Sequence, residues 1–252
     1  MKKSIVSSFL AAGLAVMASG SAKAGDVDLT APGSSATING AVYQQEIFQP
    51  AGTGFIRSFV RLQSPGHSTE EKGYNTDGRK TLFDENNSPQ FTRSLLLSDL
   101  VSLNGNYTFL LDVNEPNGKK DDGLLNLTEL KVYLGATGDE LEANPDDLGT
   151  KIFDQGDNVA LLKDLGNGSG KSDYTVSIPV TDFNVGGGNF VYLYSHFTNA
   201  QGGFEEWAAH TGTTPPPPPH GIPLPAAFPA GLAMIGLLGA ASVAQRIRKS
   251  IA

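Results

Sequence analysis

The chain has 252 residues, a formal net charge of −8 and no cysteine, so disulfides and thiolate metal sites are excluded. All 26 acidic residues lie between residues 25 and 211, whereas six of the 18 basic residues lie outside that segment, which leaves it a formal charge of about −14. Because such a segment would be repelled by nucleic acid and by anionic lipid, neither is expected as a partner.

The first 24 residues have the three parts of a secretory signal peptide. Lys2 and Lys3 supply a positive start, residues 5–18 form a short apolar core, and Ala22-Lys-Ala24 provides the small residues that precede cleavage. The apolar core is too short to persist as a stable membrane span. We therefore expect signal peptidase to cut after Ala24.

Residues 25–211 are expected to form one domain, because a segment of this length suffices for one sizeable core. Short runs rich in β-branched and aromatic residues alternate with Gly, Asn and Asp, as strands alternate with turns. These runs predict strands at 37–48, 55–62, 91–97, 107–113, 127–134, 158–162, 174–180 and 190–197. Eight or nine strands in one domain predict an all-β fold, an antiparallel β-sandwich of the jelly-roll or Greek-key type.

Two further expectations concern the surroundings of these strands. Residues 64–89 are polar and rich in Gly and Asn, which predicts a long surface loop. Pro179 cannot donate a ladder hydrogen bond, so its strand is expected at the edge of a sheet.

An acidic stretch after the predicted strand 107–113 offers the hard oxygen ligands that calcium prefers. It is not an EF-hand, because Pro116 stands where the third ligand belongs. The candidate calcium ligands are Asp112, Asn114, Glu115 and Glu129. Two interpretations stay open: a calcium site at a strand end, or a solvated acidic loop in a hairpin that joins 107–113 to 127–134.

Other motifs predict no catalytic chemistry. The stretch 165–172 resembles a phosphate-binding loop only in part, since Leu165 stands where the first glycine is needed and no helix pattern follows; a Gly/Ser hairpin turn is expected instead. The four histidines lie far apart, at His67, His196, His210 and His220. No metal-binding or nucleophile motif accompanies them. We therefore expect no enzyme, and no cofactor other than the calcium considered above.

The C-terminal end is expected to enter a membrane. Residues 212–221 form a proline-rich linker, whose five prolines favour an extended spacer. Residues 222–244 are almost wholly apolar, Gly, Ala or Pro, and are long enough to cross a bilayer as a helix. A basic tail follows at Arg246, Arg248 and Lys249, and such a cluster favours a cytoplasmic C-terminus.

The order of these parts resembles a known sorting signal. The stretch before the span reads Ile222-Pro223-Leu224-Pro225-Ala226, and with the apolar span and basic tail it resembles the PEP-CTERM family, in the variant whose recognition stretch reads VPLPA or IPLPA. The commonest form of that family has Glu where this chain has Leu224. The resemblance covers residues 222–252, about an eighth of the chain. It implies a bacterial protein that an exosortase sorts from a transient membrane anchor to the cell envelope, surface or extracellular matrix.

Three stretches of the central domain are more loosely similar to ectodomains of PEP-CTERM proteins: residues 73–79, 111–115 and 202–207. This similarity implies a surface protein with a β-sandwich fold, and it carries no reaction.

The sequence thus predicts an exported, non-catalytic surface or matrix protein, with signal peptidase and an exosortase as its processing enzymes. A second interpretation is a carbohydrate-binding module for extracellular polysaccharide, using aromatic side chains such as Tyr192, Tyr194 or Trp207. A third is a secreted polysaccharide hydrolase, in which paired carboxylates would supply the acid and the base.

Overall fold

The computed structural model describes residues 25–48, 56–66, 68–116, 118, 122–166 and 168–211. The predicted signal peptide, linker and sorting signal lie outside these ranges, as do His67 and His220. Within the ranges, no helix is both long and apolar enough to cross a membrane.

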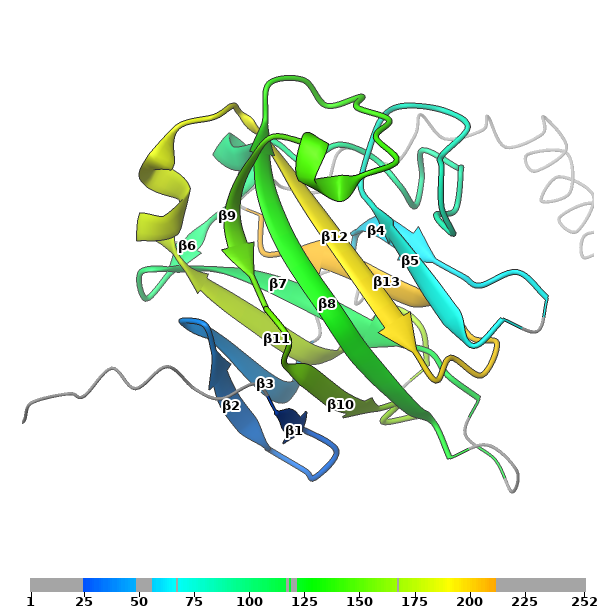
Figure 1. The fold of residues 1–252 in the computed structure, drawn as a ribbon. Coiled ribbons are helices and arrows are strands. Elements are labelled where there is room, and N and C mark those ends of the chain that lie inside the picture. Colours follow the sequence, from blue (N-terminus) through cyan, green and yellow to red (C-terminus); the bar gives the residue numbers. More distant parts are fainter. Residues whose placement is uncertain are drawn as a thin grey trace, which may run out of the picture. The chain divides into compact units, whose positions relative to one another are not determined.

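The described residues form two β-sheets, which confirms the predicted all-β sandwich (Figure 1). Sheet A has the strand order β1-β10-β8-β12-β5, and β9 pairs with the C-terminal part of β8, from Lys131 to Leu134. Its strands are β1 (Asp26–Asp28), β5 (Glu70–Tyr74), β8 (Leu124–Gly135), β9 (Thr150–Asp154), β10 (Val159–Lys163) and β12 (Phe190–Thr198). All their pairings are antiparallel except that of β1 with β10.

Sheet B has the order β2-β3-β11-β7-β13-β4, with the short β6 paired to β7, and all of its pairings are antiparallel. Its strands are β2 (Ser35–Ile38), β3 (Ala41–Phe48), β4 (Ser58–Leu62), β6 (Ser102–Leu103), β7 (Asn106–Val113), β11 (Ser172–Pro179) and β13 (Glu205–Ala209). Three short 3-10 helices, Leu97–Asp99, Pro145–Asp147 and Val180–Val185, lie between strands.

The main core lies between the sheets and follows from the alternation of side chains along each strand. In β12, Val191, Leu193 and Phe197 join this core, whereas Tyr192 and Tyr194 join a second apolar cluster on the other face of sheet A. The Tyr192 hydroxyl donates a 2.8 Å hydrogen bond to the carbonyl of Thr137, which attaches the segment after β8 to that face.

The three aromatic side chains considered for carbohydrate binding are therefore not available at the surface. Tyr192 and Trp207 are 0% exposed and Tyr194 is 5% exposed. Trp207 uses its indole N–H to donate a 3.0 Å hydrogen bond to Ser195 Oγ of the opposite sheet. These residues stabilise the fold and form no binding platform.

Local turn chemistry divides one predicted strand into two. The run 37–48 contains Asn39-Gly40, where both residues have positive φ (47° and 91°), as a two-residue hairpin turn requires. The chain therefore turns back here, and β2 pairs with β3.

Several other predicted elements are wrong. The run 91–97 contains no strand: after a turn at Phe91 the chain continues without regular structure to the helix Leu97–Asp99, and Leu96 makes an isolated bridge to Phe190. The predicted loop 64–89 contains β5, an edge strand held by its pairing with β12. The predicted hairpin of 107–113 with 127–134 does not form, because β7 belongs to sheet B and β8 to sheet A.

The stretch around 165–172 is a turn, as expected, but it connects the two sheets and makes no hairpin: β10 precedes it in sheet A and β11 follows it in sheet B. Pro179 does not mark an edge strand either. Its strand, β11, is central, and Pro179 is the last residue, beyond the point where pairing with β3 ends at Ser177. No ladder hydrogen bond on that side is lost.

Candidate metal centre

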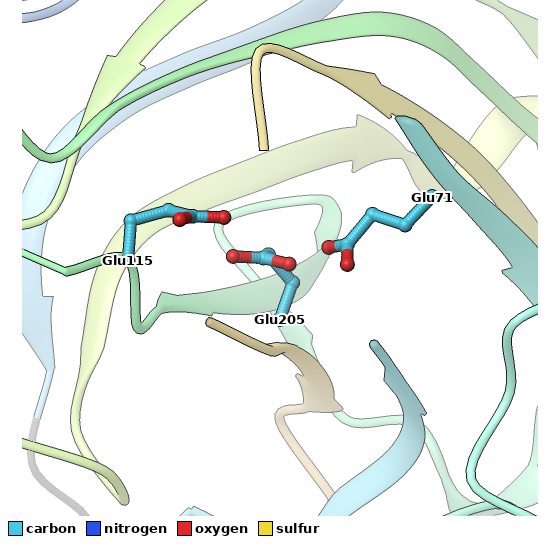
Figure 2. A group of neighbouring side chains, drawn as sticks. All are labelled: Glu71, Glu115 and Glu205. Carbon is cyan, nitrogen blue, oxygen red and sulfur yellow. The ribbon is translucent and has the colours of Figure 1, made fainter. Parts of the chain in front are cut away.

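Three glutamates meet between the two sheets. Glu71 lies in β5, Glu205 opens β13, and Glu115 lies two residues beyond the end of β7. Each offers a carboxylate oxygen, and these oxygens all lie within 4.8 Å of one another. Figure 2 shows the Glu205 carboxylate between the other two. In the described part of the chain, this is the one group of three or more His, Cys, Asp or Glu side chains placed to share a metal ion.

The glutamates face the core because of strand alternation. Glu205 precedes Trp207 by two residues, so both side chains point to the same face of β13, and Trp207 belongs to the main core. Glu71 in β5 lies opposite Phe197 of β12, another core residue. Glu115 continues the inner face of β7 past its last residue. Each glutamate thus occupies a position that normally carries an apolar side chain.

Hydrogen bonding leaves this cluster incompletely satisfied. Glu71 Oε2 accepts a 2.8 Å hydrogen bond from the backbone N–H of Ser64, and Glu115 Oε2 accepts one of 2.7 Å from the N–H of Gln201. Glu71 Oε1 and both oxygens of Glu205 have no hydrogen-bond partner, although Glu205 is 0% exposed. An ionised carboxylate buried in this way is costly unless a positive charge compensates it.

The electrostatics of Glu71 show the same cost. Burial raises the pKa of Glu71 to about 8, the hydrogen bond from Ser64 opposes that rise, and the charge of Glu115 adds to it. Without a cation, the cluster therefore holds a proton near neutral pH.

Glu85 shows how this fold satisfies the hydrogen bonding of another buried carboxylate. It is 7% exposed and accepts backbone hydrogen bonds from Tyr74 (3.0 Å) and Phe83 (2.9 Å), one to each oxygen. By contrast, no hydrogen-bond donor of the described residues contacts either oxygen of Glu205. Complete burial without hydrogen-bond donors therefore distinguishes the Glu205 carboxylate from that of Glu85.

The loop before β13 fits closely against the segment that carries Glu115. A Cβ atom on Gly203 would lie 2.0 Å from the backbone oxygen of Asn114, so only glycine allows this approach. The same loop contains Gln201, whose N–H holds the Glu115 carboxylate. Backbone packing thus positions one wall of the cluster.

Of the four calcium ligands considered from the sequence, the structure brings only Glu115 into this cluster. Asp112 lies opposite Glu206 on the other face of sheet B and accepts a 2.6 Å hydrogen bond from the N–H of Gly170; burial raises its pKa to about 7. Asn114, which lies between Asp112 and Glu115 in the chain, is half-buried. Glu129 lies on β8, where it accepts a 2.7 Å hydrogen bond from Lys131 Nζ.

Sequence reasoning missed Glu71 and Glu205, which lie 134 positions apart. Glu205 carries one usable signal: in Glu205-Glu206-Trp207 it shares the parity of the tryptophan, and a tryptophan in a strand normally faces the core. Glu71 has no such signal, because Glu70-Glu71-Lys72-Gly73 is polar on both faces.

Apart from the glutamate cluster, a hollow of about 360 Å³ lies beside β4, and its lining includes three arginines, Arg57, Arg61 and Arg93. Arg61 pairs with Glu206 at 2.9 Å and lies 3.6 Å from the centre of the Phe91 ring. Arg93 donates to backbone carbonyls, among them that of Gln90. Arg57 is exposed, and its side chain makes no hydrogen bond or ion pair described for this structure.

Comparison with known proteins assigns this chain to no family. No protein-family model, no curated protein and no solved structure matches it. The function of the chain is therefore to be inferred from its own residues and fold.

Proposed function

We propose that the protein is an exported, non-catalytic surface or matrix protein, which an exosortase sorts through its C-terminal signal. The observation that carries this proposal is the order of three parts at the end of the chain: Ile222–Ala226, an apolar stretch to residue 244, and the basic residues Arg246, Arg248 and Lys249. A signal peptide at residues 1–24 would bring the domain across the membrane, and residues 212–221 would separate it from the anchor.

The sandwich is proposed to be a jelly roll, an architecture of two packed four-stranded sheets built from two Greek keys. The strand order supports this type. Four strands of sheet B run β4-β13-β7-β11, and four of sheet A run β5-β12-β8-β10. Taken in chain order, these eight strands change sheet at every step except that from β8 to β10. This is the interleaving that two Greek keys produce.

Two features support a role without catalysis. The clustered carboxylates of Glu71, Glu115 and Glu205 are at most 2% exposed, so a substrate cannot reach them as it would reach the acid and base of a hydrolase. The His196 ring lies 3.5 Å from the carboxylates of both Glu70 and Glu129. Its described side-chain partners are thus two carboxylates, and neither is a serine or cysteine nucleophile.

A mass spectrum of the protein recovered from the surface of the producing cells tests the proposal. We expect a chain that begins after Ala24 and ends near Pro223–Ala226, because signal peptidase and the sorting enzyme each remove one end. In cells that lack the exosortase, the basic tail should remain attached. Surface material that retains Arg246 to Lys249 in normal cells would contradict sorting, and material that retains residues 1–24 would contradict export by a cleaved signal.

A second candidate function is the binding of an extracellular polysaccharide. The arginine-lined hollow beside β4 favours it, because the exposed guanidinium of Arg57 can contact the carboxylates of acidic sugars. The buried aromatic residues Tyr192, Tyr194 and Trp207 would have no part in it.

A further inference from the structure

We propose that Glu71, Glu115 and Glu205 bind one calcium ion between the two sheets, and that this ion joins β5 of sheet A to β7 and β13 of sheet B. The proposal goes beyond export and sorting, and neither depends on the other. It rests on the meeting of three carboxylates (Figure 2) and, independently, on the complete burial of Glu205 with both oxygens unpartnered.

The missing partners indicate a cation. Glu71 Oε1 and both oxygens of Glu205 lack donors, and a proton shared among them would satisfy only one or two of the three. A divalent ion contacts all of them at once and also offsets the repulsion among the carboxylates. The strongly acidic domain around the cluster further attracts cations.

The ligand type and spacing indicate calcium. All the ligand atoms are carboxylate oxygens, with no imidazole or thiolate, which suits a hard cation. Calcium lies about 2.3–2.6 Å from its ligands, so two oxygens on one ion can be up to about 5 Å apart, and the observed limit of 4.8 Å fits within this span. Magnesium gives up its water reluctantly and demands a regular octahedron, so it is expected to bind more weakly in this buried cluster.

The test uses the full chain, produced in cells, purified in detergent and stripped of metal with a chelator. We expect calorimetric titration with calcium chloride to show one ion bound per chain. At a calcium concentration about a hundred times the Kd, the melting temperature of the domain should rise by about 5–10 °C. Terbium bound at the same site should emit when Trp207, the sole tryptophan, is excited. Added calcium should displace the terbium and so abolish this emission.

The central variant is Glu205→Gln, which keeps the side-chain shape and removes the buried charge. It should melt no lower than the wild type without calcium, yet it should lose the calcium shift and the terbium emission. The matched control is Glu70→Gln, which removes the same charge one residue from Glu71 at an exposed position of β5 and should keep both responses. Should Glu205→Gln fail to fold, Glu71→Gln replaces it, and the stoichiometry of the wild type still decides.

Three results would overturn the proposal. The first is a wild type that binds no calcium, which would mean that protons alone neutralise the cluster. The second is a calcium shift that persists in both Glu205→Gln and Glu71→Gln. The third is an equal shift with sodium chloride at matched ionic strength, which would show general screening of the acidic surface.

Discussion

Glu71 shows how one buried carboxylate makes stability depend on pH. Its pKa lies at about 8 in the folded chain, against an ordinary value of 4.5, chiefly because of burial. The folded state therefore keeps a proton over a range in which the unfolded chain has lost it. By linkage, the stabilisation is fully present below pH 4.5 and is lost as the pH rises through about 8.

We predict that the calcium-free protein loses stability as the pH rises from about 4.5 to about 8, and that Glu71→Gln loses less, because glutamine stays neutral. The difference in unfolding free energy across this range should be on the order of a few kcal/mol. Asp112, whose pKa is raised to about 7, adds a slope of the same sign that remains in the variant. Urea denaturation at several pH values measures both slopes, and parallel curves for the two proteins would contradict the prediction.

At the scale of an element, the loop before β13 determines how closely Glu115 and Glu205 can approach. Its Gly203 contacts the backbone oxygen of Asn114, at the end of the segment that carries Glu115. A side chain there must displace backbone on one side, since neither partner is the flexible end of a side chain.

We predict that Gly203→Ala destabilises the domain by about 1–3 kcal/mol and weakens calcium binding. The matched control is Gly118→Ala, since a Cβ atom there would meet nothing within 4 Å. Denaturation with urea gives the stability of both variants, and calorimetry gives their affinity for calcium. If Gly203→Ala matched Gly118→Ala in both measurements, the close approach would not position the cluster.

At the scale of the whole molecule, the arginine-lined hollow is a basic feature on a strongly acidic domain. Three of its lining residues are arginines, whereas the segment 25–211 as a whole carries a charge of about −14. An acidic polymer would be repelled by most of this surface and attracted locally at the hollow.

If the protein binds an acidic polysaccharide, we predict that Arg57→Ala reduces binding several-fold, since the exposed guanidinium of Arg57 is available for a sugar carboxylate. Co-sedimentation with alginate, a polyuronate, measures the effect and should weaken with salt. Lys151→Ala is the control, because it removes the same charge from β9 in sheet A. Equal binding by both variants and the wild type would exclude the hollow as the site.

Local pattern was enough to predict the class of fold and many of its strands. The alternation in 107–113, 127–134, 174–180 and 190–197 predicted strands that the structure contains as β7, β8, β11 and β12. This works because side chains alternate between the two faces of a strand, and β-branched and aromatic residues favour strands, whatever the strand pairs with. The predicted signal peptide and sorting signal are likewise patterns within short segments, and they stay predictions.

Only the tertiary structure decided which strands pair and which side chains meet. The sequence could not show that β7 and β8 lie in different sheets, or that the polar run of β5 forms a strand, because β12 supplies its partner. Glu71 and Glu205 come together for the same reason. Their meeting depends on how two sheets face each other, and strand alternation fixes the face of each residue without fixing what lies opposite.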